Sequence, residues 1–246
     1  MARLTVLGSC GAWPEPGRAC AGFLLSQGNH HVVLDLGYGA ASRLFTHVAA
    51  KDLDAVVITH EHPDHIADLT ALSRAWHYTV EDQRLPLHCT PGVLRRLEAA
   101  EPRPHPATIF DIHTFARPET VGPWQLTSTP LPHHVPNHGV RLSSPHGTAA
   151  YSGDTGPSRL LVELARDADL LICEATLQGE PPDEPRRLLT AAEAGRTAAE
   201  AGVRTLLLTH FWPGADRSVS AAEARREFDG EVLIADEGLT IELDAH

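Results

Sequence analysis

The sequence predicts an α+β protein in which two mixed β-sheets pack face to face and helices cover both outer faces, a four-layer αββα sandwich. Short apolar runs of strand length alternate with turn signals along the 246 residues. Consecutive strands dominate the first half of the chain, whereas strands alternate with helices in the second half. This order differs from the regular alternation of a doubly wound sheet. The length favours a single domain over residues 1–246.

Each predicted strand is a short run rich in aliphatic and β-branched residues that ends at a turn signal. In chain order these runs are residues 4–7, 23–25, 32–36, 56–58, 85–88, 124–127, 139–142, 149–151, 170–173, 206–208, 232–235 and 239–243. Between them, segments with the apolar spacing of helices follow one another. They are residues 40–50, 66–78, 91–100, 158–168, 191–201 and 220–228.

The composition is that of a globular chain, with 42% hydrophobic and 21% charged residues and no apolar stretch that could span a bilayer. The first residues contain only a very short apolar run, so we expect no secretion signal. Four scattered cysteines indicate neither a disulfide framework nor a thiolate zinc site, and we expect a cytoplasmic protein. The net charge of -12 argues against a nucleic-acid partner. The sixteen histidines are unusual and require an explanation.

The stretch VVITHEHPDHIADL offers that explanation, because a buried strand ends at Thr59 and is followed at once by His60, His62, Asp64 and His65. Side chains at alternating positions point the same way, so the first two histidines can project together. Imidazole and carboxylate ligands suit zinc, manganese or iron, and two such ions about 3.5 to 4 Å apart can share a hydroxide. A helix N-cap would explain Asp64 alone and would leave three histidines unexplained.

The pattern H-x-H-x-D-H after a strand resembles the signature of the metallo-β-lactamase superfamily. The segments LPHHVPNHGVRL, AYSGDTG and LLLTHFWPG follow in the order in which family members present a further histidine, a bridging aspartate and a last histidine. The resemblance implies the metallo-β-lactamase fold and two divalent metal ions, with zinc favoured and manganese or iron as alternatives. It places His60, His62 and His133 on one ion, Asp64, His65 and His210 on the other, and Asp154 between them.

The third segment leaves a choice among His133, His134 and His138. His133 is preferred because H-x-V-P-x-x-G resembles the phosphodiesterase branch that includes the tRNA 3′-processing nuclease. The opening LTVLGSCGAWPEPGRACAGFLL and the segment EAGRTAAEAGVRTLLLTHFWP also resemble the short-form branch related to that nuclease, so the likeness covers most of the chain. Within the branch, the nearest resemblance is to actinobacterial proteins described as cyclic-nucleotide phosphodiesterases.

Two departures from the branch concern the substrate and the proton donor. The tRNA-processing enzymes carry a long arm between the metal-binding histidine and the bridging aspartate, but only 21 positions separate His133 from Asp154 (154 − 133). Leu188 stands where relatives carry a histidine. The candidate catalytic residues are Asp64, within the metal motif, and Glu174 and His138, which could donate a proton to the leaving group as could a metal-bound water.

We therefore expect a dinuclear metal-dependent hydrolase, a phosphodiesterase acting on a small cyclic nucleotide or cyclic phosphate through a hydroxide that bridges the metals. Nearby backbone carbonyls and Asp35 are both candidate acceptors for the second ring nitrogen of a ligand histidine. The alternatives are an endonuclease acting on RNA 3′ ends, a thioester or lactone hydrolase, and a metal-bearing binding or carrier protein without catalysis. We expect a small phosphodiester as partner, no membrane partner, and a possible homodimer by analogy with the superfamily.

Overall fold

The computed structural model describes residues 1–180 and 185–243, and its strands form two seven-stranded sheets. The first sheet has the order β14-β1-β2-β3-β4-β5-β6. Its strands are β1 (Ala2–Gly8), β2 (Gly22–Gln27), β3 (His30–Leu36), β4 (Ala55–Ile58), β5 (Leu85–Cys89), β6 (Phe110–His113) and β14 (Thr240–Leu243).

The second sheet has the order β13-β12-β11-β10-β9-β8-β7. Its strands are β7 (Glu119–Val121), β8 (Trp124–Leu131), β9 (Asn137–Ser144), β10 (Gly147–Tyr151), β11 (Leu170–Glu174), β12 (Thr205–Thr209) and β13 (Glu231–Ile234). Both sheets are mixed, because each combines parallel pairs with antiparallel pairs.

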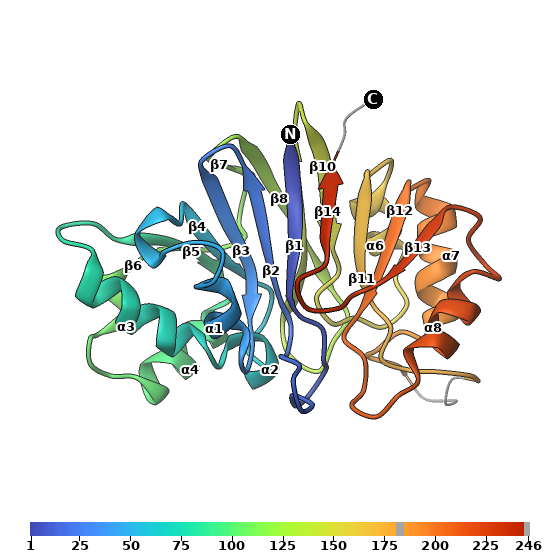
Figure 1. The fold of residues 1–246 in the computed structure, drawn as a ribbon, viewed down its shortest axis with the longest axis horizontal. Coiled ribbons are helices and arrows are strands. Elements are labelled where there is room, and N and C mark those ends of the chain that lie inside the picture. The colour runs from blue at the N-terminus through green and yellow to red at the C-terminus, as the bar shows by residue number, and fades with distance from the viewer. Residues whose placement is uncertain (181–184, 244–246) are drawn as a thin grey trace.

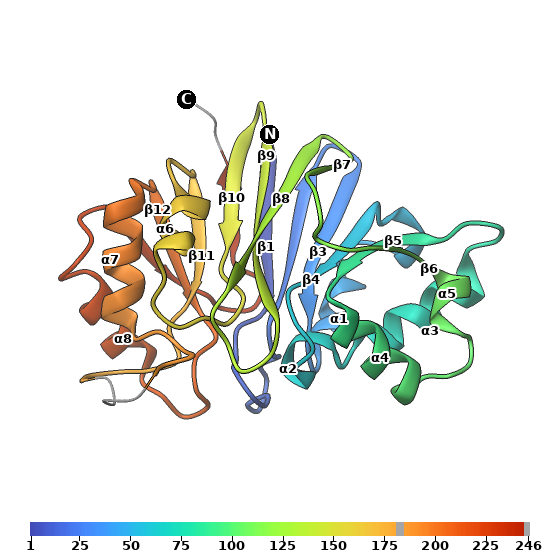
Figure 2. The ribbon, with the colours of Figure 1, turned by 180° about the vertical axis from the view of Figure 1, so that it is seen from behind.

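Helices cover the outer face of each sheet, as Figures 1 and 2 show from opposite sides. Five α-helices accompany the first sheet: α1 (Ala40–Leu44), α2 (Pro63–Ile66), α3 (Leu69–Thr79), α4 (Pro91–Ala100) and α5 (Pro106–Ile109). Among the described residues, three cover the second: α6 (Arg159–Ala165), α7 (Ala191–Ala201) and α8 (Arg217–Ala224). One apolar cluster lies under each helical layer and a third lies between the sheets, where Trp124 and Tyr151 are fully buried. The predicted αββα sandwich is confirmed.

The direction of the strands determines where the polar loops meet. Strands β3 to β6 are parallel to one another, and so are β10 to β13. The carboxyl ends of parallel strands lie at one edge of a sheet, which is where open α/β sheets place their sites. All four residues of β4 are buried, so this strand is fixed in the core up to Ile58. The histidine motif begins directly beyond it.

The predicted and observed elements differ in a few places. The predicted helix over residues 40–50 is wrong beyond Leu44, where the chain turns and brings Val48 and Ala50 into the core. The predicted single helix over residues 66–78 is wrong at its start. It is divided into α2 and α3 at Asp68, whose carboxylate accepts the Ala41 N–H at 2.9 Å. The strands β6 and β7 and the helix α5 were not predicted, because segments of three or four residues carry no detectable period.

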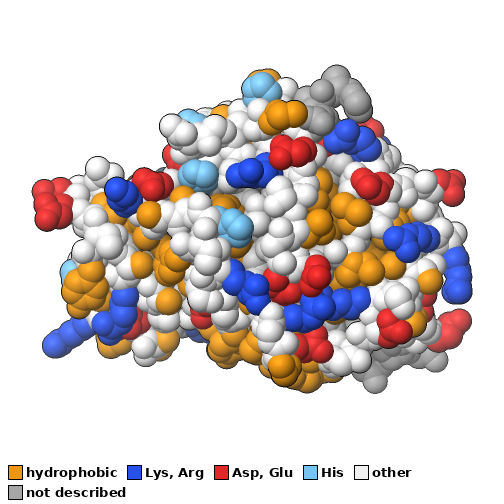
Figure 3. Space-filling model, in the orientation of Figure 1, with side chains coloured by type: hydrophobic (Ala, Val, Ile, Leu, Met, Phe, Trp, Pro, Cys, Tyr) orange, Lys and Arg blue, Asp and Glu red, His pale blue; other side chains and the backbone are white. Residues whose placement is uncertain are grey.

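The surface carries charges of both signs. On the face in Figure 3, Lys and Arg side chains are interspersed with Asp and Glu side chains and do not form a continuous basic surface. Among residues 1–180 and 185–243, every helix is too short or too polar to cross a bilayer.

Candidate metal centre

The predicted ligands lie at the edge where the parallel strands of both sheets end. His60 and His62 follow β4, Asp154 follows β10, and His210 follows β12. His133 comes from the loop between β8 and β9. A backbone hydrogen bond from the His138 N–H to the Thr59 carbonyl, 3.2 Å long, connects the two sheets at this edge. Residues far apart in the chain therefore meet in one buried cluster.

The first ligand group consists of three histidines. His62 Nδ1 lies 3.1 Å from His60 Nε2 and 3.1 Å from His133 Nε2. Ligand nitrogens bound tetrahedrally to zinc at its usual bond lengths are about 3.3 Å apart. These three nitrogens, together with an oxygen of Asp154, all lie within 4.8 Å of one another. The group has the ligand types and the spacing of a site for one divalent ion.

The second ligand group consists of Asp64, His65 and His210, whose ligand atoms also lie within 4.8 Å of one another. His210 Nε2 is 3.2 Å from Asp64 Oδ2, and His65 Nε2 is 3.7 Å from the same oxygen. The Ala12 N–H donates to Asp64 Oδ2 at 2.6 Å and fixes this carboxylate. The group is almost fully buried, with all three residues at most 6% exposed.

Asp154 lies between the two groups and directs one oxygen to each. Its Oδ1 is 3.2 Å from His65 Nε2 and 3.2 Å from His210 Nε2. Its Oδ2 is 3.7 Å from His60 Nε2 and 3.6 Å from His133 Nε2. A carboxylate in this position can contact an ion on either side, which is the geometry that a bridging ligand requires.

Asp35 orients histidines of both groups through its Oδ2, while its Oδ1 accepts the Thr59 N–H at 2.7 Å. Its Oδ2 accepts the Nδ1–H of His65 at 2.7 Å and the hydroxyl of Thr59 at 2.8 Å. The Thr59 oxygen in turn accepts the Nδ1–H of His60 at 3.0 Å. The Tyr151 hydroxyl, from the opposite sheet, donates to the same Asp35 oxygen at 2.8 Å. Each Nδ1 therefore carries the proton, and each Nε2 offers its lone pair to the centre.

His210 is oriented in the same way from the second sheet. Its Nδ1–H donates to the Thr176 hydroxyl oxygen at 2.8 Å, and that hydroxyl donates to Glu174 Oε2 at 2.6 Å. The backbone of His210 has a left-handed φ of 57°, which is unusual for a residue other than glycine. A side chain on Gly11 would contact this imidazole, because an added Cβ would lie 2.6 Å from its Cε1. The position of the ring is thus fixed on several sides.

Burial and neighbouring carboxylates set the charges of these histidines. Burial lowers the pKa of His133 to about 4 and holds the pKa of His60 well below its ordinary value, so both are neutral at neutral pH. Burial also acts to lower the pKa of His65, but the carboxylates of Asp154 and Asp35 outweigh it and raise that pKa well above its ordinary value. The surrounding carboxylates thus favour a positive charge in the second group, either a proton on His65 or a metal ion.

Two buried atoms at the centre have no hydrogen-bond partner among the described residues, His65 Nε2 and Asp154 Oδ1. They are 3.2 Å apart, yet their orientation is not that of a hydrogen bond. Buried polar atoms are normally paired, and an unpaired histidine nitrogen facing an unpaired carboxylate oxygen fits ligands that point at a metal ion. The residues present therefore fit a divalent metal.

The other candidates from the third segment lie outside the two groups. The His138 ring stacks on Phe115 with centroids 4.7 Å apart, and its Nδ1 has no hydrogen-bond partner among the described residues. His134 packs edge-on against His133, with centroids 5.2 Å apart. His133 itself donates through Nδ1 to the Arg187 carbonyl at 2.9 Å. The backbone of the segment that carries Leu188 therefore fixes the ring of the candidate ligand His133.

The candidate catalytic residue Glu174 is fully buried behind Thr176. Burial and the nearby Asp154 raise its pKa to about 8. Its other oxygen accepts the Thr155 N–H at 2.7 Å, so both oxygens are occupied by donors within the fold. Glu174 acts on His210 through Thr176, and it reaches none of the ligand atoms directly.

Sequence reasoning did not find the hydroxyl groups of Thr59, Tyr151 and Thr176 as part of the site. Thr59 directly precedes the histidine motif, and Thr176 ends the segment CEAT. Their positions next to these motifs were the sequence features that could have identified them. Tyr151 had no such feature, because its contact with Asp35 joins residues 116 positions apart in the chain.

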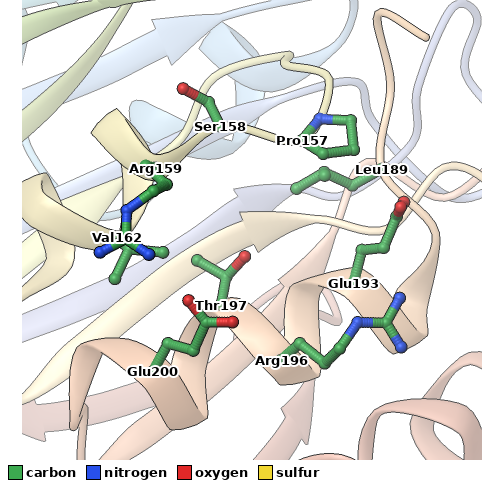
Figure 4. Close-up of a pocket in the computed structure, with 9 residues that line it drawn as sticks. All are labelled: Pro157, Ser158, Arg159, Val162, Leu189, Glu193, Arg196, Thr197 and Glu200. Carbon is green, nitrogen blue, oxygen red and sulfur yellow. The ribbon is translucent and has the colours of Figure 1, made fainter.

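A separate cavity of about 310 Å³ lies between the start of α6 and the outer face of α7. Figure 4 shows Arg159 beside it from α6, with Glu193, Arg196 and Glu200 from α7. Its lining contains none of the metal-ligand candidates. This cavity belongs to the helical layer and is not part of the metal centre.

The substitution Asp35→Asn tests whether Asp35 orients the ligands. The amide cannot accept from all of its present donors, so we expect metal affinity to fall by about 10-fold to 100-fold. The measurement is metal retained by the folded protein against a competing chelator. Tyr151→Phe, which removes one donor to Asp35 and leaves both histidine contacts, serves as the control and is expected to lose less. Unchanged metal affinity in folded Asp35→Asn would contradict this role.

Known proteins match this chain over most of its length. The β-lactamase superfamily domain matches residues 30–211. An uncharacterized protein of Mycobacterium tuberculosis is 37% identical over 249 residues, which cover 96% of this chain and 90% of that protein. The ribonuclease Z of Haloferax volcanii is 27% identical, with 98% of this chain and 95% of that protein covered.

The probable metallo-hydrolase YhfI of Bacillus subtilis is 31% identical, with 98% of this chain and 99% of that protein covered. Its crystal structure matches with a TM-score of 0.89 at 30% identity, covering 98% of this chain and 99% of the other. The resemblance to the metallo-β-lactamase superfamily, and to a branch that includes ribonuclease Z, is thereby confirmed. The chain belongs to the β-lactamase superfamily, and its fold and its histidine and aspartate clusters are those of a metallo-hydrolase.

Proposed function

We propose that this protein is a two-metal phosphodiesterase that hydrolyses a small phosphodiester, such as a cyclic nucleotide. The observation that carries the proposal is the position of Asp154, which directs one oxygen to each of two complete ligand groups. Bound there, two divalent ions would lower the pKa of water and neutralise the negative charge that develops on the phosphoryl oxygens. Zinc is favoured by the histidine-rich first group, with manganese or iron as alternatives.

The protein's own residues supply orientation and spacing. His60, His62 and His133 would hold one ion, and Asp64, His65 and His210 would hold the other. Asp35 and Thr176 keep the protons of the histidines on the outer ring nitrogens. The fixed rings require little rearrangement during the reaction, which is how a preorganised site stabilises developing charge.

The interval between His133 and Asp154 supports a small substrate. It is occupied by β9, β10 and the turn between them, which belong to the second sheet. No arm extends from this described interval that could grip a polynucleotide.

The charges near the candidate metal centre also favour a small substrate over a polynucleotide. Arg18, in the loop between β1 and β2, pairs with Glu237 at 3.1 Å, and Arg217, at the start of α8, pairs with Glu15 at 3.4 Å, so these two positive charges are offset by carboxylates. The face in Figure 3 likewise mixes the two signs. A polynucleotide requires a basic surface for most of its affinity.

Two exposed tryptophans beside the second ligand group support a substrate with a flat ring. Trp13 is 47% exposed and Trp212 is 45% exposed, and their rings meet edge-on with centroids 5.2 Å apart. Trp212 lines a cavity of about 460 Å³ together with Thr176, the residue that orients His210. Aromatic surfaces of this kind stack on nucleobases.

Hydrolysis of RNA is the second candidate function, because the ribonuclease Z of Haloferax volcanii aligns over 98% of this chain. Its requirements differ from those of a small-substrate enzyme, since an extended RNA needs a basic path leading to the metals. The pairing of Arg18 and Arg217 with carboxylates therefore favours hydrolysis of a small phosphodiester over hydrolysis of RNA.

Turnover assays on the zinc-loaded and manganese-loaded protein test the proposal. We expect hydrolysis of 3′,5′-cyclic AMP and of bis-para-nitrophenyl phosphate, and a loss of roughly 100-fold or more in Asp154→Asn, because a ligand of both ions is weakened. A precursor RNA with a 3′ extension and an acyl thioester are assayed in parallel. The proposal is wrong if the metal-loaded protein turns over neither phosphodiester, or if RNA or the thioester is the preferred substrate.

The substitution Trp13→Ala tests whether the two exposed tryptophans bind the base of a nucleotide. Stacking on a base contributes about 1–3 kcal/mol, so inhibition by AMP is expected to weaken by roughly 5-fold to 150-fold. Inhibition by ribose 5-phosphate, which lacks the base, is the matched control and is expected to stay unchanged. Equal weakening for both inhibitors would show that Trp13 supports the site without contacting a base.

A further inference from the structure

A second group of metal-ligating side chains lies away from the centre, at the open edge of the sandwich. His88 is in β5 and His113 ends β6, and the two residues are directly opposite each other in the register of the first sheet. Glu119 begins β7, the edge strand of the second sheet. The chain between β6 and β7 passes from one sheet to the other, as Figure 2 shows. The three side chains therefore meet where the edges of the two sheets are joined.

Both histidines face the same carboxylate oxygen. Glu119 Oε2 is 2.8 Å from His113 Nδ1 and 3.9 Å from His88 Nδ1. The imidazole rings are stacked, with centroids 4.8 Å apart and an interplanar angle of 27°. Ligand atoms in a tetrahedral zinc site are separated by about 3.3 Å, a value between the two distances observed. The three ligand atoms all lie within 4.8 Å of one another, a spacing at which they could hold one ion.

The outer nitrogen of His113 has the partner that a metal-bound histidine normally has. Its Nε2 lies 3.3 Å from Asp111 Oδ2, so a proton on Nε2 can be donated to this carboxylate. A carboxylate on the outer nitrogen fixes the tautomer and directs the lone pair of the inner nitrogen toward a metal. Here the inner nitrogen is the one that faces Glu119.

His88 has no other evident role for its ring. Its side chain is only 4% exposed, and within residues 1–180 and 185–243 its ring nitrogens form no hydrogen bond. Burial, and then the neighbouring His113, lower its pKa to about 4, so its lone pair is free at neutral pH. A metal ion beside Glu119 and His113 would use this lone pair, as neutral imidazoles do when they bind zinc.

The exposure of the other two side chains leaves space for water. Those of His113 and Glu119 are 30% and 20% exposed, so the group is open on one side. Two imidazoles and one carboxylate, with water in the fourth position, form a recurrent zinc ligand set. Softer imidazole ligands also favour zinc over magnesium or calcium.

We propose that His88, His113 and Glu119 bind one divalent transition-metal ion, zinc by its ligand chemistry, at a site separate from the candidate hydrolytic centre. The ion would connect the edge of the first sheet to the edge of the second. It would also close the segment between β6 and β7, because His113 and Glu119 are at the two ends of that segment. The expected role is to hold the two sheet edges together.

The test is a count of zinc ions on the full chain after loading with zinc alone and dialysis to remove weakly bound metal. We expect His113→Ala and Glu119→Gln each to retain one zinc fewer than the wild-type protein. His146→Ala, at an exposed position in the β9–β10 turn, is the matched control and is expected to retain the wild-type number. The difference between variants does not depend on turnover, so it remains meaningful whichever substrate the hydrolytic centre takes.

Equal zinc counts in all four proteins would overturn the proposal and leave an ion pair between His113 and Glu119. Circular dichroism confirms that the variants are folded, which is expected because both altered side chains are partly exposed. Anomalous diffraction from a zinc-loaded crystal gives an independent reading on the wild-type protein. A peak between Glu119 and the two histidines is expected, and the absence of a peak there would also overturn the proposal.

Discussion

Four carboxylates, those of Asp35, Asp64, Asp154 and Glu174, are buried at the edge where the two sheets end. Burying a charge in a protein interior is costly unless the charge is paired and hydrogen-bonded. Here the carboxylates face histidines, hydroxyls and backbone N–H groups, and the remaining negative charge raises the pKa of His65 well above its ordinary value against the effect of burial. The site is therefore built to hold cations, and the surrounding structure depends on that requirement.

Residues of both sheets position the candidate metal ligands. The first sheet provides Asp35, which contacts His65 directly and His60 through Thr59. The second sheet provides Tyr151, which donates to the same carboxylate across the core. Asp35 has a left-handed φ of 53°, and such conformations cost about 1–3 kcal/mol when held by a non-glycine residue. Relative movement of the sheets would break these contacts, so the packing of the sandwich and the geometry of the centre are coupled.

Most of the fold could be predicted from the sequence, because long elements carry periodic patterns. The helix predicted over residues 191–201 matches α7, which has a capping box at Thr190 and Glu193. The short strands β6 and β7 escaped prediction, and with them the contact between His113 and Glu119. The histidine motif after β4 indicated a metal centre, because a helix N-cap would leave the three histidines directly beyond this buried strand unexplained. The distances from Asp154 to both groups, and the contact of Tyr151 with Asp35, depend on how the sheets pack and are not encoded locally.

The central claim is that Asp154 joins two metal ions, one in each ligand group. Anomalous diffraction at the zinc edge from a crystal of the zinc-loaded protein tests this claim most directly. The account predicts two peaks about 3.5 to 4 Å apart in this centre, with one Asp154 oxygen directed to each. A single peak in the centre, or two peaks with Asp154 bound to only one of them, would contradict it.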